Sequence, residues 1–187
     1  MTWTLIQTYS FNNTILISSQ FNEIFTTLYE NTPISENTLV WNGYRLSNPR
    51  MQAIKENSEF LLFTCNYEKS LSLYGSDYVE IYLPDLEGDV LDGNGTLDVF
   101  IERGHIGGQY FGDCHTWLAQ NAREILHVDM YYGYPACSEF TTPSITNYTL
   151  CNLFHYFGNY QFGHNCLDVA HRCVESPEST TQLWFGH

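Results

Sequence analysis

The chain has 187 residues, which is enough for one ordinary domain or for two small ones with a buried core. Aromatic residues make up 16% of the chain and hydrophobic residues 43%, a composition typical of a globular protein. Seven Lys and Arg stand against 21 Asp and Glu, so the net charge is −14. Because polyanions are bound by clustered Lys and Arg, this charge makes nucleic acid and anionic membrane poor partners, and it fits either a basic partner or simply solubility.

The first residues, Met1-Thr2-Trp3-Thr4-Leu5, contain no charged segment followed by a long apolar one, so no secretory signal is predicted. No stretch of about 18 or more apolar residues occurs, so no transmembrane segment is predicted. We therefore expect a cytoplasmic protein with reduced thiols, and delivery as an effector stays open. The chain has six cysteines: Cys65, Cys114, Cys137, Cys151, Cys166 and Cys173.

Residues 1–68 contain several β-type runs around one helical pattern. The first two runs are separated by Asn12 and Asn13, which tolerate the backbone of a tight turn, so they predict a β-hairpin. Helical spacing of apolar residues across 24–28 predicts a helix. The β-type runs, in chain order, are 4–9, 14–18, 39–41 and 60–63.

This order of hairpin, helix, short strand, turn and strand resembles ubiquitin and its relatives. The likeness lies in the segment Leu39-Val40-Trp41-Asn42-Gly43-Tyr44-Arg45-Leu46 and in the loop and strand of 54–63. The resemblance implies a ubiquitin-like β-grasp domain over 1–68, and another small β-rich domain is the alternative. No Gly-Gly follows the last strand, so such a domain would act noncovalently, as an adaptor or packing partner.

Residues 69–187 form the second predicted domain, which is rich in Cys and His. Strand patterns occur at 78–83 and 97–101. Asp113 and Asn165 are suited to cap two helices, and each would place a cysteine in the first helical turn. The N–H groups and dipole at such an end favour the thiolate form, so Cys114 and Cys166 are the candidate nucleophiles.

Asn165-Cys166 resembles the late Asn-Cys pair of the circularly permuted papain-like thiol hydrolases. These include the PPPDE isopeptidases and the lecithin:retinol acyltransferase-like family. The resemblance implies that Cys166 is the nucleophile and that His105 is the general base and then the acid. His115 or Asn165 would orient the ring or bind the oxyanion. The aromatic residue that follows this pair in both families is absent, since Leu167 stands there.

Cys114 carries the second alternative, because Asp113-Cys114 weakly resembles the helix start of ovarian-tumour-type deubiquitinases. His155 or His164 would then be the base. In a third alternative both cysteines are small core residues and the domain is noncatalytic. No C-x₂-C pair occurs, so we assign no metal ligands and expect no cofactor, while a zinc site built from separated residues stays open.

The sequence therefore predicts an α+β protein, with a ubiquitin-like β-grasp domain followed by a papain-like α+β domain. The expected function is a thiol hydrolase that cleaves an amide or isopeptide bond of a protein or peptide, such as a ubiquitin-like conjugate, through an acyl-thioester. The alternative is a noncatalytic adaptor that recruits partners, a basic protein among them. The apolar C-terminal tail, 184–187, is expected to dock on the body of the protein.

Overall fold

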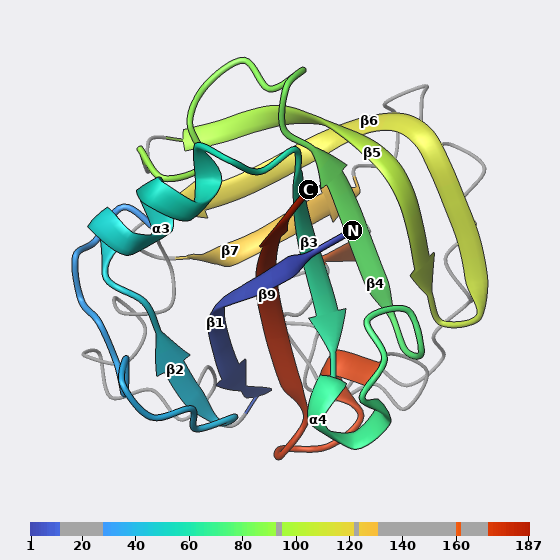
Figure 1. The fold of residues 1–187 in the computed structure, drawn as a ribbon. Coiled ribbons are helices and arrows are strands. Elements are labelled where there is room, and N and C mark those ends of the chain that lie inside the picture. The colour runs from blue at the N-terminus through green and yellow to red at the C-terminus, as the bar shows by residue number, and fades with distance from the viewer. Residues whose placement is uncertain (12–27, 93–94, 122–123, 131–159, 162–171) are drawn as a thin grey trace.

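The computed structural model describes residues 1–11, 28–92, 95–121, 124–130, 160–161 and 172–187. These residues form one antiparallel sheet of nine strands in the order β2-β1-β9-β3-β4-β5-β6-β7-β8 (Figure 1). The strands are β1 (Trp3–Ser10), β2 (Gly43–Arg45), β3 (Phe60–Cys65), β4 (Tyr78–Tyr82), β5 (Gly95–Ile106), β6 (Gln109–Asn121), β7 (Glu124–Met130), β8 (Tyr160–Gln161) and β9 (Thr180–Gly186). The helical elements of the described residues are α3 (Asn48–Lys55), α4 (Tyr67–Ser70) and the 3₁₀ turn η2 (Arg172–Val174).

The predicted α+β fold class is wrong, because the described chain is mostly antiparallel sheet with short helices. The helix predicted to start at Asp113 is also wrong, because that residue lies inside the thirteen-residue strand β6. Asp113 has φ of 51°, whereas a capping residue has an extended backbone. Residues 24–27 of the expected helix and the helix start at Asn165 lie outside the described residues, and Leu28 is in a bend.

Several predicted strands are confirmed. The runs at 4–9, 60–63, 78–83 and 97–101 correspond to β1, β3, β4 and β5. The strand predicted at 39–41 is wrong, because β2 begins only at Gly43. The residues before β2 form a turn in which the Gly43 N–H donates to the Val40 carbonyl at 3.0 Å.

The last strand of the chain lies inside the sheet, as the third of nine strands in their spatial order. β9 pairs with β1 on one side and with β3 on the other, and all seven of its residues are buried (Figure 1). Backbone hydrogen bonds between Thr2 and His187 hold the two termini side by side. The expectation that the apolar tail docks on the body is therefore confirmed. Both predicted segments, 1–68 and 69–187, contribute strands to this one sheet.

The alternation of side chains gives the sheet two different faces. Ile6, Leu61, Val79, Ile101 and Leu183 point to one face, where they belong to the main hydrophobic core. We call this the inner face. The opposite face, the outer face, carries a smaller buried cluster of Leu62, Tyr78 and Trp184.

A tight turn joins the two longest strands, β5 and β6. Ile106 pairs with Gln109, so only Gly107 and Gly108 form the loop. Their φ values of 56° and 84° are the positive values that a two-residue hairpin turn requires and that Gly adopts without strain. The turn fixes the register of eleven paired positions from Ile106 back to Gly95.

Arg45, at the end of β2, is a fully buried cation. Its guanidinium donates to the Glu30 carbonyl at 2.6 Å, and its backbone exchanges hydrogen bonds with Ile34. Burial lowers the pKa of this guanidinium to about 10. These bonds attach the loop before β2 to the edge of the sheet.

A disulfide and an amide attach the turn before β9 to the end of β3. Cys65 is bonded to Cys173, 108 residues later, with the two Cα atoms 4.6 Å apart. The Asn66 side-chain amide donates to the Arg172 carbonyl at 2.6 Å and to Glu175 at 3.1 Å. The Asn66 side-chain oxygen accepts a hydrogen bond from the backbone N–H of Thr180, which is the first residue of β9.

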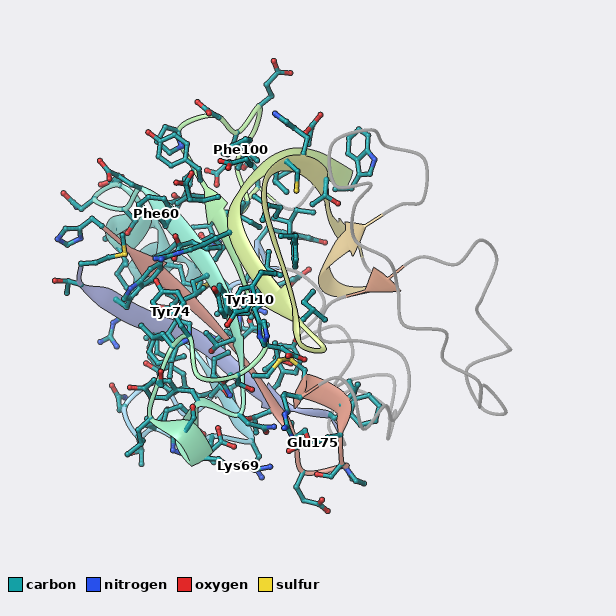
Figure 2. All side chains as sticks on the ribbon, turned by 90° about the vertical axis from the view of Figure 1, so that its right-hand side faces the viewer. Phe60, Lys69, Tyr74, Phe100, Tyr110 and Glu175 are labelled. Atoms are coloured by element: carbon teal, nitrogen blue, oxygen red, sulfur yellow. A yellow bond between two sulfur atoms is a disulfide. The ribbon has the colours of Figure 1, made fainter. Side chains whose placement is uncertain are left out.

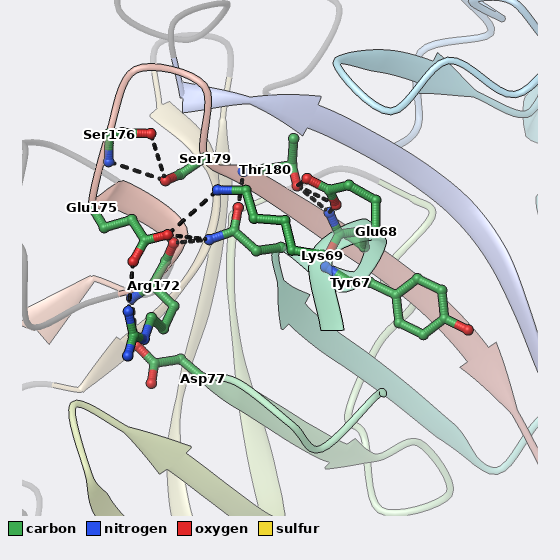
Figure 3. A network of polar contacts seen from close by, with 11 residues as sticks. Tyr67, Glu68, Lys69, Asp77, Arg172, Glu175, Ser176, Ser179 and Thr180 are labelled. Carbon is green, nitrogen blue, oxygen red and sulfur yellow. Dashed lines mark hydrogen bonds and ion pairs between the residues drawn. The ribbon is translucent and has the colours of Figure 1, made fainter. Parts of the chain in front are cut away.

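Asp77 makes the second attachment of this turn (Figure 3). Its buried carboxylate accepts the Arg172 N–H at 2.8 Å and the Gly107 N–H at 3.1 Å, so it links the turn before β9 to the β5–β6 hairpin. Burial raises the pKa of this carboxyl, and the two N–H donors partly offset that effect. Glu175 adds ion pairs with Arg172 and Lys69 at the surface.

We expect Leu183→Ala in β9 to lower the free energy of unfolding by about 2–5 kcal/mol, because it opens a cavity in the main core under the sheet. Denaturant unfolding followed by tryptophan fluorescence measures the change. Leu39→Ala, at an exposed position, is the control and should change it by less than about 0.5 kcal/mol. Equal effects of the two variants would contradict the central position of β9.

Replacing Cys65 and Cys173 together by Ser should lower the free energy of unfolding by about 2–5 kcal/mol, since the disulfide closes a long loop. Urea unfolding without reductant measures this. Leu71→Ser, an exposed change in the same region, is the control and should stay within about 0.5 kcal/mol. An unchanged midpoint in the double variant would show that these two cysteines are not bonded to each other.

Candidate functional site on the outer face of the sheet

The outer face of the sheet carries a row of aromatic side chains across neighbouring strands. These positions face one another in the strand register, and the side chains are partly or largely exposed. On β9 the row has a glycine, Gly186, where a Cβ would overlap the Trp3 ring. We call this set the aromatic row; its members, from β1 to β6, are Trp3, Phe60, Tyr82, Phe100 and His115.

Three neighbouring pairs of rings in the aromatic row contact one another. The ring centres of Trp3 and Phe60 are 6.4 Å apart, and those of Phe60 and Tyr82 are 5.4 Å apart. Phe100 and His115 meet edge to face at 5.4 Å. Trp117, two residues after His115 in β6, continues the row opposite Asp98 of β5. These ring contacts thus form two groups, one from β1 to β4 and one on β5 and β6.

The rest of the outer face is covered by α4 and by the loop that follows it. Tyr67 of α4 packs edge to face on Trp184 of β9 at 4.8 Å. Leu73 packs in the same cluster, and Tyr74 packs on Tyr78 at 5.0 Å. Figure 2 shows Phe60 and Phe100 toward one end of the face and Tyr74 and Tyr110 farther along it. The aromatic row is thus the part of the face that this segment leaves open.

A carboxylate, a guanidinium and a phenol form a compact group under the loop. Glu80 of β4, whose side chain is 2% exposed, accepts two hydrogen bonds from Arg103 of β5, at 3.0 and 3.2 Å. The Tyr74 hydroxyl donates to Glu80 at 2.7 Å, and the Arg103 guanidinium lies 4.4 Å from the Tyr74 ring centre.

Two members of this group, Arg103 and Tyr74, have raised pKa values. The hydrogen bond to Glu80 raises the pKa of Arg103. Burial, and then the Glu80 hydrogen bond and charge, raise the pKa of Tyr74. An arginine held between an aromatic ring and a carboxylate is therefore already present on this face.

His105 and Tyr110 form a second aromatic group near the β5–β6 turn. Their ring centres are 4.4 Å apart, and Tyr78 lies 6.1 Å from His105 on the other side. Tyr110 is 79% exposed. His105 Nδ1 is 3.4 Å from the Ser76 carbonyl and 3.9 Å from Asp77. This group offers an exposed ring for stacking at the other end of the face.

His115 and Asp98 form a polar pair beside Phe100 and Trp117. Nδ1 of His115 is 2.9 Å from an Asp98 oxygen, and the two side chains are 49% and 38% exposed. The pair combines a solvent-accessible carboxylate with two aromatic neighbours. Such a combination can bind a cation through both its charge and the ring faces.

Most cations of the described chain form ion pairs, whereas many of its exposed carboxylates do not. Of the seven Lys and Arg, five form ion pairs, Arg45 is buried, and Arg123 lies outside the described residues. Eight exposed carboxylates have no cation partner among the described residues: Glu56, Glu59, Asp85, Glu87, Asp92, Glu102, Asp113 and Glu178.

Some of these unpaired acids lie close in sequence to the aromatic row. Glu59 precedes Phe60, Asp85 follows the end of β4, and Glu102 lies two residues after Phe100. The cations of this region are already used, Arg103 by Glu80 and Lys55 by Asp89. Exposed acids therefore adjoin the strands of the row in sequence, and the two cations named here are paired with other carboxylates.

The residues predicted to be catalytic fall into two groups. Cys166, Asn165, His155 and His164 lie outside the described residues, so their roles stay predictions. His105 and His115 lie on β5 and β6 with their side chains on the outer face. Cys114 is buried on the inner face in the main core. The sheet therefore separates Cys114 from both of these histidines.

The expectation of reduced thiols is wrong for the described cysteines. Cys65 and Cys173 are bonded to each other, and Cys114 is also in a disulfide. The partner of Cys114 lies outside the described residues. A bonded sulfur is no nucleophile, so Cys114 has no thiolate in this structure.

The described residues contain no group of three or more His, Cys, Asp or Glu side chains that could hold a metal ion. In the same part of the chain, no helix has the length and apolar character needed to cross a membrane. Comparisons with protein-family models, with curated proteins and with solved structures found no match to this chain.

Sequence reasoning missed the aromatic row as a site. Its members come from five strands, and each is one aromatic residue in an alternating pattern, which is ordinary for a half-buried strand. The high aromatic content, 16%, was the available signal. Only the strand order brings the rings together.

Arg103→Ala should lower the free energy of unfolding by about 1–3 kcal/mol, because it leaves the buried Glu80 carboxylate without its cation. Thermal or urea unfolding at neutral pH measures the loss. Adding Glu80→Gln should recover part of it, since the neutral amide is less costly to bury. Arg50→Ala, which removes an exposed ion pair, is the control and should cost less than about 1 kcal/mol.

Proposed function

We propose that this protein is a noncatalytic binding protein whose aromatic row receives a basic protein or peptide partner. The observation that carries the proposal is the partly exposed aromatic row in a strongly acidic chain, with exposed acids adjoining its strands in sequence. Partly exposed rings supply apolar contact area at small entropic loss, and their faces attract cations. A net charge of −14 attracts a basic partner over a distance and opposes association with a second copy of the chain.

The position of the row supports the same role. Regular strands hold its rings, so little ordering is required when a partner binds. The loop with Tyr74 covers the neighbouring part of the face, which gives the row a defined border. The proposal keeps the basic partner expected from the sequence, but the binding surface is the outer face of the sheet and no β-grasp domain is involved.

The thiol hydrolase stays a prediction that depends on Cys166. No observation on the described residues favours it, because Cys114 is in a disulfide and faces away from His105 and His115. The cytoplasmic location also stays a prediction. The Cys65–Cys173 disulfide favours an oxidising compartment instead, because such bonds persist there.

Titration of the intact protein with fluorescent peptides tests the proposed function. A Lys- and Arg-rich peptide should bind, with affinity that falls as salt is raised, while an acidic peptide of equal length should not. Phe60→Ala should weaken binding of the basic peptide about threefold to tenfold, since it removes a ring from the middle of the row.

Tyr29→Ala is the matched control, because it removes an exposed ring outside the row. It should leave the affinity unchanged. Circular dichroism and the unfolding midpoint verify that both variants are folded. Absence of binding to the basic peptide at low salt, or equal binding by the folded Phe60→Ala variant and the parent, would overturn the proposal.

A further inference from the structure

The aromatic row runs across the strands with the spacing of the sheet. Trp3, Gly186, Phe60, Tyr82 and Phe100 are directly opposed in the register of five successive strands, β1, β9, β3, β4 and β5. Neighbouring strands are about 4.8 Å apart, so positions two strands apart, such as Phe60 and Phe100, are separated by about 9.6 Å. Figure 2 shows these two residues toward the same end of the outer face.

This spacing matches the repeat of a polyproline II helix. Such a helix has three residues per turn and rises about 3.1 Å per residue, so residues three apart lie on the same side at about 9.3 Å. Laid along the row, residues i and i+3 of the helix would therefore meet positions two strands apart. An extended β-segment presents a side chain on one side about every 6.6 Å, which matches neither one strand spacing nor two.

The chemistry of the row favours the same conformation. Phe60 and Phe100 have no polar side-chain atoms, so a β-segment lying on them would bury backbone N–H groups without acceptors, which is costly. Proline has no backbone N–H, and its carbonyl can accept from the Trp3 indole N–H or the Tyr82 hydroxyl. Neither of these two groups donates a hydrogen bond within the described chain.

We propose that the basic partner binds through a proline-rich segment, in the polyproline II conformation, that lies along the aromatic row from β1 to β5. This inference rests on the proposed function and names the kind of segment that the row selects. Prolines three residues apart pack on the rings, and flanking Lys or Arg residues supply attraction to a chain of charge −14. Because such a segment is already ordered before it binds, little conformational entropy is lost.

The test compares two peptides of identical composition, by fluorescence anisotropy on the intact protein. Each has two lysines at both ends and three prolines among alanines. Successive prolines are three residues apart in the first peptide, whereas they are two and four residues apart in the second. The first should bind about threefold to tenfold more tightly, because only its prolines repeat with the turn of the helix.

Tyr82→Leu should remove most of this preference, since it keeps an apolar side chain but loses the ring and the hydroxyl. Tyr82→Phe, which keeps the ring, should retain most of it. Tyr29→Leu, at an exposed ring outside the row, is the matched control and should leave the preference unchanged. Circular dichroism and the unfolding midpoint of each variant verify that it is folded.

Two results would overturn the inference while the proposed function stands. One is equal binding of the two peptides by the parent protein. The other is a preference that the folded Tyr82→Leu variant retains in full. If neither peptide binds at low salt, the proposed function fails and this inference fails with it.

Discussion

The structure depends on the insertion of the last strand between two early ones. β9 forms hydrogen bonds with β1 and β3 along its whole length, and its seven residues are buried. Without it the sheet would have two open edges in its middle, and unpaired buried backbone groups are costly. The turn that leads into β9 is attached to the body by Cys65–Cys173 and by the Asn66 and Asp77 side chains. A covalent bond and buried polar contacts thus fix the place where the strand enters.

The entry of β9 also determines the two faces of the sheet. Leu183 and Phe185 complete the main core, while Trp184 packs with Leu62 and Tyr78 on the opposite side. Gly186 lies beneath the Trp3 ring and leaves space for it in the aromatic row. A larger residue there would displace the ring. The exposed aromatic surface is therefore a consequence of the same strand that stabilises the fold.

The outer face combines two modes of attraction that act at different ranges. The negative charge of the whole chain acts over about a Debye length, and the rings act at contact. The exposed cations of the described chain already form ion pairs with its own carboxylates. The remaining negative charge therefore attracts ligands that are positively charged. The pairing of Arg103 with Glu80 and Tyr74 is an internal example of such a contact. These features are the basis of the proposed binding role.

By itself, the sequence determined local structure where one pattern was dominant: the strands at β1, β3, β4 and β5, and the acidic, aromatic composition. Around Cys114 the pattern was ambiguous, because residues at helical spacing coexist with an alternation of Cys114, Thr116 and Leu118 against His115 and Trp117. Hydrogen bonding to β5 makes this segment a strand and not a helix, and the strand directs the Cys114 side chain into the core. Only the tertiary structure determined the Cys65–Cys173 bond, the interior position of β9 and the aromatic row. Each of these joins residues that are far apart in the chain, and a local sequence pattern does not identify such partners.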